Sequence, residues 1–168
     1  MRRVTASAAI AVLVCTLTNL LGASEKRIDL AAAVTKKDAE AALSETVKDP
    51  QPRNEEGADG YYSRCSYHSQ NPGRSLVLRV RQAGPGQLAP AKQLEELSAG
   101  NSQIKPISRL GDQAAFACEG AESSLSRVLM LYVAKGNAFI TVGIRGINDE
   151  KVALEKAKTV ARRILAKL

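Results

Sequence analysis

The most reactive side chains of this chain lie in one short stretch, residues 61–69, of sequence YYSRCSYHS. It holds the only histidine, His68, and one of the three cysteines, Cys65. A cysteine nucleophile needs a histidine base within hydrogen-bond reach. The stretch has the composition of a β-strand, on which side chains three residues apart point to opposite faces. The sequence therefore predicts no catalytic cysteine–histidine pair here unless a turn begins at His68.

Metal binding and the common catalytic motifs find little support either. Cys65 and His68 have the Cys-x-x-His spacing of two zinc ligands, but no second histidine completes a tetrahedral site. The carboxylates of residues 54–59 lack the spacing of a calcium-binding loop, and no Gly-x-Ser-x-Gly motif occurs. We therefore predict a non-enzymatic protein without metal or cofactor. The alternative is an envelope hydrolase or sensor domain in which His68 acts with nearby tyrosines and these carboxylates.

The N-terminus has the features of an export signal. Arg2 and Arg3 precede the apolar run of residues 10–17, and a stretch of small residues ends at Ala23. We predict that residues 1–23 are removed and that the protein is exported, to the periplasm or the cell exterior.

The remainder of the chain is expected to form one domain. Residues 24–34 are predicted to lead into a single α+β domain of residues 35–168, with no transmembrane segment after cleavage. Two alternatives stay open for the N-terminus: an uncleaved membrane anchor, and lipidation at Cys15. Val14 stands where a lipidated cysteine is normally preceded by a small residue.

Two cysteines, Cys65 and Cys118, remain in the mature chain. In an oxidising compartment an even number of cysteines most simply forms disulfides. A Cys65–Cys118 bridge would span 53 residues and add about 4 kcal/mol of stability in the chain-entropy model. We therefore predict this disulfide.

The elements that position these residues follow from periodicity and turn chemistry. Thr35, with Asp38 three residues on, has the form of a capping box and predicts a helix start. The polar residues 49–60, with two prolines and two glycines, predict a loop. The other expected elements are a hairpin of strands 61–67 and 75–81, a helix 90–99, a short extended piece 104–107, strands 113–118, 125–134 and 138–145, and a closing helix 149–167. The order α-β-β-α-β-β-β-α predicts an α+β fold with helices packed on one face of an antiparallel sheet.

Several phrases of the sequence resemble a known family. They are VTKKDAEAAL, GYYSRCSY, ISRLGDQAAF and LYVAKGNAFITVGI, together with the basic closing helix. They look like small secreted or lipid-anchored bacterial proteins of uncharacterised function with a PsbP-like α+β sandwich. The resemblance implies an accessory or binding module outside the cytoplasm. It carries over no catalytic residues.

The charge of the chain bears on its partners. The net charge is +7, or +5 from 22 basic and 17 acidic residues once residues 1–23 are removed. The export signal and the few aromatic residues argue against nucleic acid. An envelope protein or an anionic envelope surface is the expected partner. The candidate binding surface consists of Arg79, Arg81, Tyr61, Tyr62 and His68. The basic residues of the closing helix are expected to form the solvated side of that helix. We therefore expect a non-enzymatic exported accessory or binding domain of the bacterial cell envelope.

Overall fold

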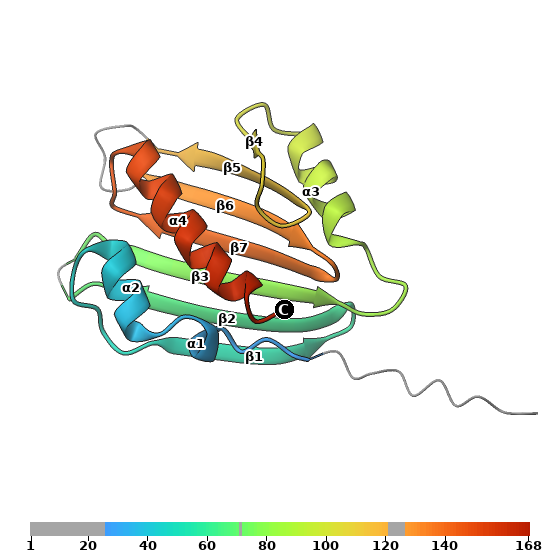
Figure 1. The fold of residues 1–168 in the computed structure, drawn as a ribbon, viewed down its shortest axis with the longest axis horizontal. Coiled ribbons are helices and arrows are strands. Elements are labelled where there is room, and N and C mark those ends of the chain that lie inside the picture. The colour runs from blue at the N-terminus through green and yellow to red at the C-terminus, as the bar shows by residue number, and fades with distance from the viewer. Residues whose placement is uncertain (1–25, 71, 121–126) are drawn as a thin grey trace, which may run out of the picture.

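The computed structural model describes residues 26–70, 72–120 and 127–168, so the predicted signal and Cys15 lie outside the described residues. Within them, seven strands form one antiparallel sheet in the order β1-β2-β3-β7-β6-β5-β4 (Figure 1). The strands are β1 (Gln51–Gly57), β2 (Gly60–His68), β3 (Ser75–Ala83), β4 (Lys105–Ile107), β5 (Gln113–Glu119), β6 (Val128–Lys135) and β7 (Ala138–Arg145). The helices are α1 (Leu30–Ala33), α2 (Lys36–Leu43), α3 (Pro90–Ala99) and α4 (Glu150–Leu165). In this part of the chain, no helix combines the length and apolarity needed to cross a membrane.

The predicted order of elements is wrong, because the chain runs α-α-β-β-β-α-β-β-β-β-α. The largest difference is β1, which lies where the polar composition of residues 49–60 predicts a loop. None of its residues is buried, and it pairs with β2 from Gln51 opposite Ser66 to Gly57 opposite Gly60. An edge strand tolerates proline and charged side chains. Backbone pairing with β2, rather than apolar alternation, therefore makes this segment a strand.

The larger core lies between the sheet and helices α1, α2 and α4 (Figure 1). Strand alternation directs Ser63, Cys65 and Tyr67 of β2 into it, and all three are fully buried. The Tyr67 hydroxyl donates a hydrogen bond to the backbone carbonyl of Val34, which joins β2 to the residue that ends α1. The buried side of α4 has helical spacing and consists of Ala153, Ala157, Val160, Ala161 and Ile164.

Helix α2 starts as the sequence predicts, at a capping box. Thr35 Oγ1 accepts a hydrogen bond from Asp38 N at 3.3 Å, and Asp38 Oδ2 accepts one from Thr35 N at 3.0 Å. Arg163 of α4 forms an ion pair with Asp38 at 3.1 Å, and Lys156 of α4 donates to Ser44 Oγ at 2.7 Å, just past the end of α2. Part of the basic side of α4 therefore holds the two ends of α2 and is not simply solvated.

Helix α3 packs on the opposite face of the sheet. Leu94 lies in a second, smaller core with Ala115 of β5 and Phe139 of β7. These strand residues alternate with Phe116 and Ile140, which belong to the larger core. The prediction of helices on one face only is therefore wrong. β5 and β7 carry apolar side chains on both faces, and α3 covers the second of them.

The predicted Cys65–Cys118 disulfide is wrong. Cys65 lies on β2 and Cys118 on β5, and three strands, β3, β7 and β6, separate them. Four steps of about 4.8 Å put the cysteines roughly 19 Å apart across the sheet, whereas a disulfide needs Cα atoms within about 7 Å. Both thiols are free, and burial raises the pKa of each. An even cysteine count therefore says nothing about the strand order that decides whether two cysteines meet.

The segment before α1 is tied to the sheet by buried polar side chains. Gln82 Oε1 accepts a hydrogen bond from Ile28 N at 2.7 Å, and Gln82 Nε2 donates to Lys26 O at 3.0 Å. Ser63 Oγ accepts from Leu30 N at 3.0 Å. Residues 26–30 are therefore held against β2 and β3.

One ion pair anchors the turn between β6 and β7. Asp112 accepts hydrogen bonds from Lys135 Nζ at 2.7 Å and from Gly136 N at 2.8 Å. These two donors, the lysine first, hold the pKa of the Asp112 carboxyl below its ordinary value. Gly136 has a φ of 56°, in the left-handed region that glycine adopts without strain.

Candidate binding site on the uncovered sheet face

Helix α3 covers only part of its face of the sheet, because it packs mainly on β5, β6 and β7 and leaves most of the face over β1–β3 open. Two adjoining depressions of about 360 and 320 Å³ lie on the open part. The first is lined by β2, β3, β7, α3 and the loop before α3, and the second by β2, β3, β6 and β7. Both include Arg79 and Thr141, so they form one continuous depression, here called the groove.

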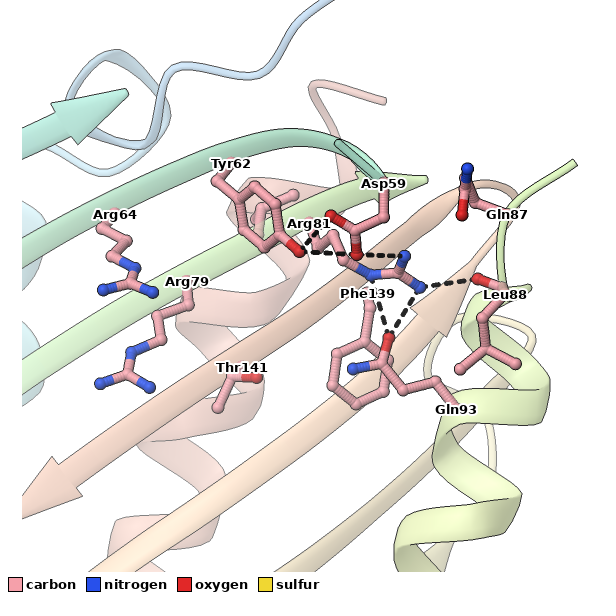
Figure 2. A pocket seen from close by; sticks show the side chains of 11 residues that line it. Asp59, Tyr62, Arg64, Arg79, Arg81, Gln87, Leu88, Gln93, Phe139 and Thr141 are labelled. Carbon is pink, nitrogen blue, oxygen red and sulfur yellow. Dashed lines mark hydrogen bonds and ion pairs between the residues drawn. The ribbon is translucent and has the colours of Figure 1, made fainter. Parts of the chain in front are cut away.

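A row of arginines crosses this face. The strand register places Arg53 of β1 opposite Arg64 of β2, and Arg64 opposite Arg79 of β3. Arg53 is paired with Glu55 at 2.9 Å. Arg64 and Arg79 are exposed, and in the described part of the chain neither guanidinium has an ion pair or a hydrogen bond. Figure 2 shows them side by side at the groove, joined to no neighbour. Like charges directly opposite each other destabilise a sheet.

Arg81, two residues from Arg79 along β3, is hydrogen-bonded to other residues of the protein. Its guanidinium donates to Gln93 Oε1 at 2.8 and 3.1 Å and to the carbonyl of Leu88 at 2.6 Å, and it lies 3.4 Å from Asp59 Oδ2 (Figure 2). Arg81 is only 8% exposed. These bonds hold α3 and the loop before it against β3, so the Arg81 guanidinium forms part of the wall of the groove.

Asp59 and Tyr62 complete this wall. The Tyr62 hydroxyl donates to both carboxylate oxygens of Asp59 at 2.8 Å. That hydrogen bond, aided by the charge of Arg81, lowers the pKa of Asp59. Burial, followed by the bond to Asp59, raises the pKa of Tyr62. The Asp59 carboxylate is therefore ionised at neutral pH and is committed to Tyr62 and Arg81.

The middle of the groove is apolar and adaptable. Val77 of β3, Gly143 of β7 and Met130 of β6 lie opposite one another in the register. A Cβ built at Gly143 would lie 3.1 Å from the sulfur of Met130, so glycine leaves room that a larger side chain would fill. Met130 is the flexible, polarisable side chain of this floor.

His68 and Arg145 lie at the other end. The register places His68 opposite Ser75, and Ser75 opposite Arg145; His68 and Arg145 are both exposed. Cys65 faces the larger core on the other side of the sheet, so it does not meet His68. Tyr62 lies six residues from His68 along β2, about 20 Å away. The structure thus does not bring His68 together with Tyr62 and Asp59, which are among the tyrosines and carboxylates that the hydrolase alternative combines with it.

The predicted binding residues are divided between the two faces. Arg79, Arg81, Tyr62 and His68 line the groove. Tyr61 lies on the other face, where the Arg27 guanidinium sits 5.5 Å from its ring centre. Among the described residues, no cluster of three or more histidine, cysteine or acidic side chains is arranged to hold a metal.

No motif in the sequence marks the neighbours of Arg79 in the groove. Strand alternation already places Arg64 on the same side of β2 as Tyr62, which was the available signal. The cross-strand register that sets Arg64 beside Arg79, and the contributions of Thr141, Met130 and Gly143, require the strand order.

No protein-family model and no curated protein matches this chain. The PsbP-like resemblance therefore stays a prediction.

Proposed function

We propose that this protein is a non-enzymatic binding domain that captures an anionic partner in the groove, as an accessory protein of the bacterial cell envelope. The observation that carries the proposal is the Arg64–Arg79 pair: two exposed guanidinium groups on neighbouring strands with no carboxylate between them. The export signal expected from the first 23 residues supports the location.

The pair suits an anion for a simple electrostatic reason. Adjacent strands are about 4.8 Å apart, so a carboxylate or phosphate can accept hydrogen bonds from both guanidinium groups at once. Binding also relieves the repulsion between them. Arginine is well suited to this task, because its planar group donates two parallel hydrogen bonds and is weakly hydrated.

The test uses a fluorescently labelled poly-L-glutamate chain and fluorescence anisotropy at two salt concentrations. Two exposed pairs, each contributing about 0.7 kcal/mol, predict that the double variant Arg64→Gln/Arg79→Gln binds about tenfold more weakly. The matched control is Lys151→Gln/Arg162→Gln, which removes the same charge from exposed positions on α4, on the other face of the sheet. The control is expected to change affinity less than about twofold. If both double variants lose the same affinity, the binding reflects general charge attraction and the proposal is overturned.

A further inference from the structure

The side chains of the groove are arranged in regular rows that run across the strands. Within the groove, the arginine row contributes Arg64 and Arg79 and continues to Thr141 of β7. The apolar row contains Val77, Gly143 and Met130, and the end row contains His68, Ser75 and Arg145. Each row is two residues from the next, which is about 7 Å along a strand. Two positively charged rows therefore flank one apolar row, about 14 Å apart.

This period is also that of an extended peptide. In a β-conformation, residues i, i+2 and i+4 point to one side at intervals of about 7 Å. A peptide lying over β3, the strand between β2 and β7, can place an acidic side chain within reach of both Arg64 and Arg79. The residue at i+2 then contacts the apolar row, and an acid at i+4 reaches Arg145, which has no ion pair among the described residues.

The shape of the face disfavours a membrane as the occupant. α3 and the loop before it rise beside the arginine row, since Leu88 and Gln93 form a wall of the groove (Figure 2). The arginine row therefore lies at the foot of a wall, which a flat bilayer cannot follow. Of the large exposed apolar side chains among the described residues, Leu88 alone borders the groove.

We infer that the groove binds an extended segment of a partner protein in which two acidic residues four positions apart flank an apolar one. This inference rests on the proposed function and names the partner of the same site. The acids meet the arginine row and Arg145, and the apolar residue meets Val77 and Met130.

The test titrates the ¹⁵N-labelled protein with each of two peptides of equal composition and follows binding by NMR. One, Thr-Glu-Thr-Val-Thr-Glu-Thr, has the inferred spacing; the other, Thr-Glu-Glu-Thr-Val-Thr-Thr, does not. The spaced peptide is expected to bind about threefold more tightly, because only it can pair with Arg145 while also pairing with the arginine row. Arg145→Gln is expected to remove that difference and leave the permuted peptide unchanged.

A second variant tests the apolar contact. Gly143→Val places side-chain atoms on the floor of the groove and is expected to weaken the spaced peptide severalfold, with folding checked in the same NMR spectra. Equal binding of the two peptides, lost in both with Arg64→Gln/Arg79→Gln, would overturn the spacing and keep the proposed function. If neither peptide binds, but the protein sediments with vesicles of phosphatidylcholine and phosphatidylglycerol and this depends on Arg64 and Arg79, the occupant of the groove is a membrane surface and the peptide inference is overturned. Peptide affinities insensitive to Arg64 and Arg79 would overturn both proposals.

Discussion

Replacing Arg81 by methionine tests whether this side chain holds α3 on the sheet. The substitution keeps an unbranched apolar stem and removes the guanidinium that bonds Gln93, Leu88 and Asp59. These partners belong to α3, the loop before it and the turn between β1 and β2. We expect Arg81→Met to loosen the wall of the groove more than the rest of the protein.

The magnitude follows from the bonds that are lost. Hydrogen bonds to charged groups contribute about 1.5–3 kcal/mol each, but the guanidinium also loses hydration on burial and the bonds are not additive. The expected net loss is about 2–3 kcal/mol in the free energy of unfolding.

Arg79→Met is the matched control, two residues away on the same face of β3. Arg79 is exposed and has no bond to protein groups among the described residues, so its replacement is expected to change stability by less than about 0.5 kcal/mol. Urea denaturation measures the two losses, and hydrogen exchange of residues 84–99 locates them. If Arg81→Met lowers the free energy of unfolding no more than Arg79→Met, or if hydrogen exchange in this segment is unchanged, Arg81 does not hold α3 on the sheet.

Three further predictions follow from the fold. Alkylation of the denatured, unreduced protein labels both Cys65 and Cys118, and of these two the folded protein labels only Cys118, because Cys65 is buried; absence of both labels from the denatured protein would show that the two are bridged and contradict the strand order. Asp112→Asn lowers the urea midpoint at neutral pH. Because the folded-state pKa of this carboxyl is depressed, its contribution is present above the ordinary value of 3.8 and is lost as pH falls through the folded value, so the variant loses less stability than the wild type as the pH is lowered below 3.8. Tyr67→Phe leaves the buried Val34 carbonyl without its donor, and calorimetry should show a loss of about 1–2 kcal/mol and a Tm lower by roughly 3–6 °C.

Local patterns predict the faces of the strands well. The period of two in residues 61–67 separates Cys65 and Tyr67, which are buried, from Tyr62 and Arg64, which line the groove. Helix α3 begins and ends at the predicted residues, with Pro90 in its first turn and Gly100 just past its end. These signals need only neighbours along the chain, and this is why they succeed.

The neighbours across the sheet need information that no local pattern holds. β7 inserts between β3 and β6, which separates the two cysteines and brings Thr141 beside Arg79. The edge strand β1 has no apolar alternation to reveal it, since its stability comes from backbone bonds to β2. The candidate site depends on this register, so only single residues of it are visible in the sequence.

The same arginines that mark the groove also explain why the protein leaves it open. α3 has ten residues, about 15 Å of helix; it packs on β5, β6 and β7 and meets β3 through the Arg81–Gln93 hydrogen bonds at one end of the groove. An apolar helix laid over β2 and β3 would bury Arg64 and Arg79 without counter-charges, and each buried unpaired charge costs several kcal/mol. The apolar segments of this chain are therefore unsuited to cover the arginine row. A partner that covers it has to supply the missing carboxylates, so the feature that keeps the face exposed also selects what binds there.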